Sequence, residues 1–290
     1  VQQPVAPRYL ALRQLTRYRK RLMDLCVQEK NRCLGFMFRK GSGLRQDPIV
    51  VHAFAATNRG LYTATDALND LLDWSPEELV TQLTTWSRGH LADPQTTAEV
   101  VRAAIQDSYP VPDALVGPLN TCLTTSFALL DAIVRQIRAL DAEIAEALRD
   151  FPEAAWLRAL PGLGPVYVAG LLAEIAGIAR FADHPALAHY AGLLWDRHQS
   201  GDFDGTHTRR IPTGNSFLRY YLVEGANSAR VHAEEFKAYY RQKRAEHADY
   251  AHQRALLFTA RKLVRILFYC LTHETPYLPP SARPARLITG

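Results

Sequence analysis

A serine in a short polar loop with several arginines nearby is the feature of this sequence most able to do chemistry. The serine is Ser200, and the arginines are Arg197, Arg209 and Arg210. A serine hydroxyl is a poor nucleophile unless a base or a strong field activates it. The arginines could bind a phosphate and stabilise the charge that develops during phosphoryl transfer. The loop therefore favours phosphoryl chemistry, with Ser200 as the candidate catalytic residue.

The same loop leaves other interpretations open. Either His198 or His207 could accept the serine proton. A serine followed by glycine in a polar loop is, however, most often a plain turn. Asp202 and Asp204 could instead hold a metal ion, although loop carboxylates are more often solvated. On this basis we assign no metal site.

A second motif, LPGLGP at 160–165, is typical of a helix-hairpin-helix turn. Gly162 and Gly164 would permit tight backbone conformations that a Cβ hinders. The helix starting at Pro165 would present free amides and a positive dipole end to a phosphate oxygen. Such contacts hold a nucleic-acid backbone without reading its sequence. The alternative is a glycine turn between two packed helices.

Charge is unevenly distributed along the 290 residues, whose net charge is +5. Residues 1–46 hold eleven basic side chains against two acidic ones, 47–150 hold six against fifteen, and 207–265 hold twelve against five. This pattern favours a polyanion-binding protein with a separate packing or assembly region. The sequence has no apolar run long enough for a membrane span and no secretory signal pattern. Its four cysteines lack zinc spacing, so we expect reduced thiols and a cytoplasmic, nucleoid-associated protein.

Apolar periodicity predicts a mainly α fold in which a long helical or coiled-coil arm precedes a compact helical domain. That domain would contain the hairpin and the serine loop, the latter as an irregular or short β segment. We expect a basic helix at 1–46, an acidic helical region with the arm at 47–150, the C-terminal domain at 151–275 and a loose tail at 276–290. The arm, at about 112–150, is predicted to mediate homo-oligomer formation. An ordinary long helix packed within its own domain is the alternative.

Several segments occur in a recognisable order: LPGLGP at 160–165, LAHYAGL at 187–193, QSG at 199–201, TGN at 213–215 and LRYYL at 218–222. This series resembles the C-terminal transposase domain of the IS110 and IS116 insertion-sequence family. The basic segments near the N-terminus resemble that family's middle region, so the resemblance covers nearly the whole chain.

The resemblance implies a DNA recombinase in which Ser200 forms a covalent link to DNA and a bridging guide RNA selects the DNA partners. We infer that Arg209, Arg210 and Asn215 lie around the cut strand, and we expect Arg197 and Arg219 to make further nucleic-acid contacts. Family members begin with a RuvC-like domain whose acidic residues hold magnesium. We expect this chain to lack most of that domain and to bind no cofactor itself. The alternative is a non-catalytic DNA- or RNA-binding module.

Overall fold

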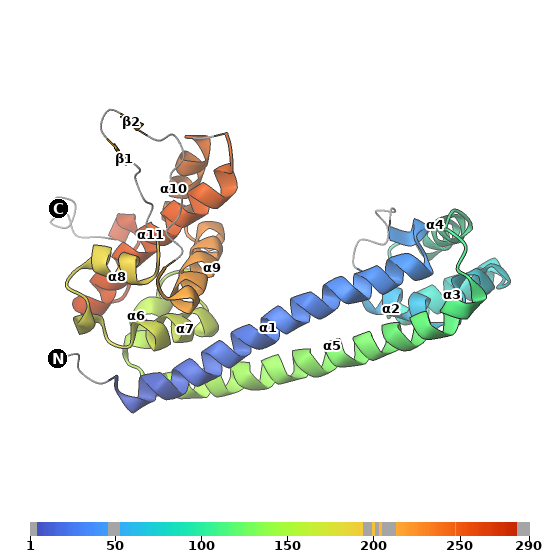
Figure 1. The fold of residues 1–290 in the computed structure, drawn as a ribbon, viewed down its shortest axis with the longest axis horizontal. Coiled ribbons are helices and arrows are strands. Elements are labelled where there is room, and N and C mark those ends of the chain that lie inside the picture. The colour runs from blue at the N-terminus through green and yellow to red at the C-terminus, as the bar shows by residue number, and fades with distance from the viewer. Residues whose placement is uncertain are drawn as a thin grey trace. The chain divides into compact units, whose positions relative to one another are not determined.

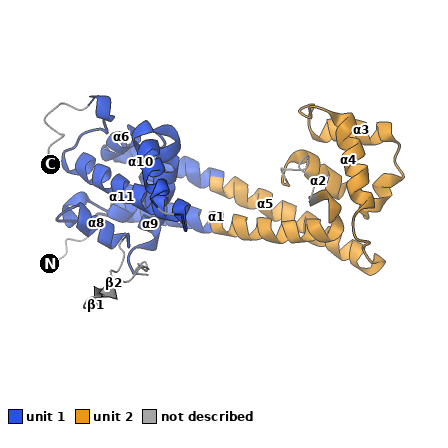
Figure 2. Ribbon diagram, turned by 90° about the horizontal axis from the view of Figure 1, so that it is seen from above, with its two compact units in different colours: residues 1–21, 138–290 blue, residues 22–137 orange. Residues whose placement is uncertain are grey.

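The fold is mainly α, which confirms the fold class predicted from the sequence (Figure 1). The computed structural model describes residues 5–45, 53–193, 199–200, 203–204, 213–246 and 248–282. The chain divides into two compact units (Figure 2). Unit 1 comprises Val1–Arg21 and Arg138–Gly290, and unit 2 comprises Leu22–Ile137.

Two long helices, α1 (Pro7–Lys40) and α5 (Asp113–Ala147), each contribute residues to both units. Their bounds lie close to the helices expected from apolar spacing. The units therefore cut across the ranges 1–46, 47–150 and 151–275 that composition suggested. Ile133, Ile137 and Ile144 on α5 are all buried within the chain. An ordinary packed helix thus accounts for much of the apolar periodicity, and self-association through this arm stays a prediction.

Unit 2 is completed by short helices, and capping side chains set the starts of two of them, α3 and α4. Ser75 Oγ accepts a hydrogen bond from the Glu78 amide, and the Glu78 carboxylate accepts one from the Ser75 amide. Asp93 caps the next helix in a similar way. A serine or aspartate directly before proline, as at Ser75 and Asp93, marks such a helix start in the sequence. The elements are η1 (Gly43–Arg45), α2 (Ala56–Thr63), η3 (Leu68–Leu72), α3 (Pro76–Trp86) and α4 (Pro94–Gln106).

Unit 1 is built around α7 (Pro165–Ile175), whose sequence is apolar on nearly every side. Val168, Ala169 and Leu171 are fully buried, and α7 packs against α9 (Ser216–His232). Gly170 permits this packing, because a Cβ there would lie 2.5 Å from the ring of Tyr221. The other helices are η4 (Leu148–Asp150), α6 (Glu153–Arg158), η5 (Ile178–Arg180), α8 (His184–Tyr190), α10 (Glu234–Ala245), α11 (Ala251–Thr272) and η6 (Pro280–Ala282).

A two-stranded antiparallel β-sheet lies between α8 and α9 in the sequence of unit 1. It consists of β1 (Gln199–Ser200) and β2 (Phe203–Asp204), and Ser200 pairs with Phe203. This agrees with the expected short β segment around the serine. In the described part of the chain, no helix is long and apolar enough to cross a membrane.

Candidate nucleic-acid site of unit 1

The LPGLGP motif forms a tight turn between α6 and α7, which pack against each other. Gly162 has a φ of +94°, and a Cβ there would lie 2.9 Å from the carbonyl carbon and oxygen of Ser228 on α9. Leu163 is buried and packs towards Gly225 of the same helix. The turn is therefore fixed against α9 by a glycine that no other residue can replace without strain.

Gly164 corrects one sequence expectation, because its backbone needs no glycine. Its φ and ψ are −71° and 171°, an ordinary extended conformation. A Cβ built at this position meets no atom within 4 Å. The two glycines thus differ: Gly162 is required by conformation and packing, whereas Gly164 leaves open space beside the helix start.

The N-terminus of α7 is suited to an anion. Its first residue, Pro165, has no amide hydrogen, and its N-cap, Gly164, offers no capping side chain. The amides of Val166 and Tyr167 follow within the first turn, where helix amides have no intrahelical acceptor. Amides at such a helix end, together with the helix dipole, attract a phosphate oxygen.

The segment that contains Ser200 begins and ends at one place on unit 1. Gly192 and Gly214 have φ values of +68° and +101°, and their backbones lie in close contact. A Cβ at Gly192 would lie 2.2 Å from the carbonyl oxygen of Thr213. The Asn215 amide also donates a 2.7 Å hydrogen bond to the carbonyl oxygen of Tyr190. Loop entry and exit are thus joined by the backbone.

For the serine loop, the structure describes only the backbone of the two strands. Ser200 and Asp204 are placed as members of β1 and β2. The other side chains named from the sequence lie outside the described residues: Arg197, His198, Asp202, His207, Arg209 and Arg210. Their roles stay predictions.

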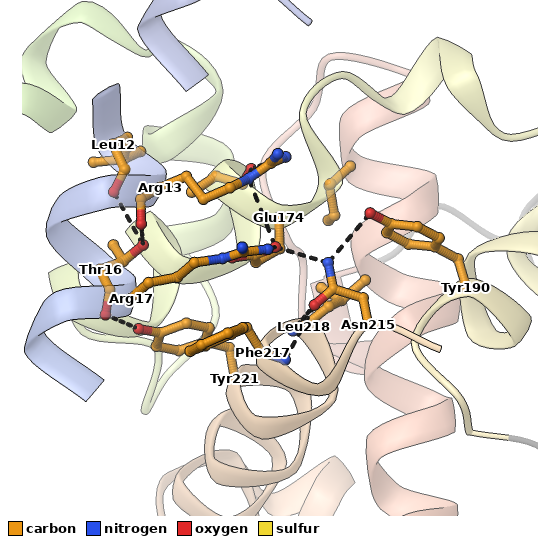
Figure 3. Close-up of polar contacts among 12 residues, drawn as sticks. Leu12, Arg13, Thr16, Arg17, Glu174, Tyr190, Asn215, Phe217, Leu218 and Tyr221 are labelled. Carbon is orange, nitrogen blue, oxygen red and sulfur yellow. Dashed lines mark hydrogen bonds and ion pairs between the residues drawn. The ribbon is translucent and has the colours of Figure 1, made fainter. Parts of the chain in front are cut away.

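Beneath the joined loop ends lies a buried ionic network centred on Glu174 of α7 (Figure 3). The Glu174 side chain has no solvent exposure. Arg17 donates from Nε to Oε1 at 2.7 Å and from Nη2 to Oε2 at 2.8 Å. The hydrogen bond with Glu174 is the main cause that raises the pKa of Arg17. The Arg17 guanidinium therefore stays charged in the folded protein.

Asn215 connects this network to the loop end. Its Nδ2 donates to Glu174 Oε2 at 2.7 Å and to the Tyr190 hydroxyl at 3.2 Å. Its Oδ1 accepts from the amides of Phe217 and Leu218, both at 3.0 Å, and so caps α9. Asn215 thus joins α7, α8 and α9, a structural role that the sequence did not indicate. Its role towards nucleic acid stays a prediction.

A surface pocket of about 660 Å³ opens where the loop ends meet. Arg17, His189 and residues 213–217 contribute to its lining. The guanidinium of Arg17 lies 4.5 Å from the ring centre of Phe217, and about a third of its side chain is exposed. Arg219, the other predicted contact in this region, donates a 3.4 Å hydrogen bond to the Thr213 carbonyl oxygen. The positively charged side chains of Arg17 and Arg219 thus lie beside the two ends of the serine loop.

The sequence did not single out Glu174 or Arg17 as site residues. The available signal for Glu174 was a carboxylate inside the otherwise apolar helix PVYVAGLLAEI. A charge buried in such a helix requires a partner. Arg17 was one of many basic residues on α1, and no local pattern distinguished it.

Unit 1 therefore combines a hairpin turn with an open helix N-terminus and a serine loop anchored over a buried ionic network. Residues 154–241, which include these features, match the profile described as Transposase IS116/IS110/IS902 family. The chain is 30% identical over 203 residues to the "Insertion element IS116 uncharacterized 44.8 kDa protein" of Streptomyces clavuligerus. It is 31% identical over 162 residues to the "Insertion element IS110 uncharacterized 43.6 kDa protein" of Streptomyces coelicolor.

The chain belongs to the IS110/IS116 family of insertion-element transposases. The first alignment covers 69% of this chain and 49% of the relative, and the second covers 56% and 39%. The chain thus spans about half the length of the curated relatives it matches.

Proposed function

We propose that this chain acts in DNA transposition and that Ser200 is the nucleophile that attacks a DNA phosphodiester. The observation that carries the proposal is the match to the transposase family over 154–241, a range that contains Ser200. The close contact between the two ends of the serine loop also supports the proposal, because it fixes where this loop is attached to the helices of unit 1.

In the proposed step, the Ser200 hydroxyl oxygen forms a bond to the phosphorus of a DNA phosphodiester. The bond from phosphorus to one deoxyribose oxygen breaks, and that oxygen leaves as a hydroxyl after protonation. The serine proton passes to a base, for which His198 and His207 are the candidates in the loop. Arg197, Arg209 and Arg210 would balance the charge on the phosphoryl oxygens. The product is a serine–DNA phosphodiester, which a second strand can later resolve.

The remaining parts of the proposal concern positioning and partners. The amides at the start of α7 would hold the DNA backbone, and Asn215 with Arg219 would set the loop end. From the family resemblance, a guide RNA would select the DNA. A second copy of the chain would associate through the long helical arm at about 112–150. Magnesium has no assigned place here, because the described residues contain no group of three His, Cys, Asp or Glu side chains able to hold a metal ion. We assign it no step.

A nucleic-acid-binding module without catalysis is the alternative function. The open N-terminus of α7 favours it, since backbone binding needs only the described residues of the hairpin. The two functions differ in whether Ser200 ever becomes linked to DNA.

A covalent-adduct assay separates these functions. The chain would be incubated with magnesium, labelled insertion-element ends and co-purified RNA, and then resolved on a denaturing gel. We expect an adduct with the wild type and none with Ser200→Ala. Ser281→Ala is the matched control, because Ser281 is an exposed serine of η6 that does not line the pocket at the loop ends and should leave the adduct unchanged. Tight binding with no adduct under any of these conditions would support the alternative.

The two hairpin glycines give a further prediction. Gly164→Ala should leave stability within about 1 kcal/mol, because the space is open and the backbone is ordinary. It should weaken duplex binding about tenfold, since a methyl group beside the α7 amides displaces a bound phosphate and loses a charge-assisted hydrogen bond. Gly162→Ala should lower stability as well, owing to its positive φ and the nearby Ser228 carbonyl.

Thermal unfolding and binding to two unrelated duplexes would check both variants. The loss of affinity should be the same for either sequence, because the contact is to the backbone. A loss restricted to one sequence would rule out the backbone role of the hairpin.

A further inference from the structure

A basic groove of about 690 Å³ lies between α9 and α10, outside the hairpin turn and the serine loop. Arg230 lines it from α9, and Lys237, Arg241 and Arg244 line it from α10. None of the described residues that line the groove is acidic. The described lining of the groove is therefore basic.

Tyr240 and Asn227 hold Arg230 in place, and Arg230 forms no ion pair with any residue that the structure describes. Tyr240 is buried, and its hydroxyl is 2.7 Å from Nδ1 of His252. The guanidinium of Arg230 lies 4.7 Å from the Tyr240 ring centre, and its Nε donates to Asn227 Oδ1 at 2.8 Å. A stacked guanidinium with a neutral hydrogen-bond partner keeps donors for a phosphate.

The cations on α10 are equally available. Among the described residues, neither Arg241 nor Arg244 forms an ion pair, and both are exposed. Lys237 is 3.5 Å from a carboxylate oxygen of Glu234, whose side chain is 76% exposed. An exposed pair of this kind contributes little and is readily exchanged for a ligand.

The spacing of these cations fits a nucleic-acid backbone. Lys237, Arg241 and Arg244 follow an i, i+4, i+7 pattern, so they share one face of α10. That face extends about 10 Å along the helix axis. One strand of duplex DNA carries a phosphate about every 3.4 Å of axis. The face therefore matches about three consecutive phosphates.

The groove also adjoins the hairpin. Gly162 packs against the backbone of Ser228, and Val231, three residues further along α9, lines the groove. Residues three apart lie on the same face of a helix. The hairpin turn and the groove therefore both contact the C-terminal part of α9.

We propose that this groove binds a further stretch of the nucleic-acid backbone held by the hairpin. Its ligand chemistry is a row of phosphates, from duplex DNA or from single-stranded RNA. The inference rests on the proposed function for identifying the polyanion as nucleic acid, but it requires no catalysis by Ser200.

The test compares Arg241→Gln/Arg244→Gln with the wild-type chain. Dissociation constants would be measured between 50 and 200 mM salt for a duplex DNA of arbitrary sequence and for a single-stranded RNA. Each lost phosphate contact lowers the slope of log affinity against log salt by about 0.9 for duplex DNA and about 0.7 for a single strand. For the two contacts removed, we expect the slope to fall by roughly 1.8 with DNA or 1.4 with RNA. The nucleic acid whose slope changes is the one that binds in the groove.

Arg135→Gln/Arg138→Gln is the matched control, because it removes the same charge from two exposed arginines of α5. Its slope should equal that of the wild type. Unchanged slopes for both ligands in the groove variant, or an equal change in the control, would overturn the inference. A changed slope without any Ser200 adduct would support binding in the groove and contradict the proposed catalysis. An adduct with unchanged slopes would support the catalysis and contradict binding in the groove.

Discussion

Glu174→Ala is expected to lower the free energy of unfolding by about 3 kcal/mol, at the lower end of the range for breaking a buried ion pair. The carboxylate is fully buried and accepts two hydrogen bonds from Arg17 and one from Asn215. Its loss leaves these donors without their acceptor. Partial exposure of Arg17 allows water to compensate in part, which is why the lower end applies.

Denaturant unfolding followed by circular dichroism would measure this loss. Glu174→Gln is the control, because it keeps the volume and one acceptor oxygen while removing the charge. We expect it to lose less stability than Glu174→Ala. A change below about 1 kcal/mol for Glu174→Ala would show that the network does not hold unit 1 together.

A second large effect is expected at Lys40, which is buried at the end of α1 in unit 2. Its Nζ donates to the carbonyl oxygens of Tyr62 and Thr65 at 2.6 and 2.9 Å and to the side-chain oxygen of Asn120. Burial lowers the pKa of Lys40 from 10.5 to about 8. Within the described part of the chain no carboxylate forms an ion pair with the ammonium group, so its desolvation is only partly offset.

The direction of the pH effect follows from proton binding. Between pH 8 and 10.5 the unfolded chain keeps the Lys40 proton, while the folded chain has released it. Stability rises with pH wherever the unfolded state binds more protons. The cost of the buried charge is therefore fully present below pH 8 and is relieved as the pH approaches 10.5, by up to about 3 kcal/mol.

Lys40→Met isolates this contribution. The unfolding free energy of the wild type minus that of the variant should increase between pH 8 and 10.5. Cys33, whose pKa burial raises to about 11, acts in the opposite direction but is common to both proteins and cancels in the difference. A difference that stays constant across this range would refute the assignment.

Most helices were predictable from sequence because local signals define them. Apolar spacing located α1 and α5, and Ser75 and Asp93 marked the starts of α3 and α4 through capping. The LPGLGP motif located the tight turn between α6 and α7 for the same reason, since a positive φ at Gly162 demands glycine.

The Glu174 network was not predictable, because its members come from separate segments. Arg17 is 157 positions from Glu174, and Asn215 is 41 positions away. Only the fold brings them together. The division into units escaped prediction for a similar reason, since α1 and α5 are each continuous helices whose tertiary contacts change along their length.

The central claim is that Ser200 becomes bonded to DNA, and peptide mapping of the adduct tests it most directly. The gel-purified adduct would be digested with nuclease and protease, and the nucleotide-bearing peptide located by fragmentation mass spectrometry. The account predicts the phosphate on Ser200. A phosphate on any other residue, such as Ser216 at the start of α9, would contradict it.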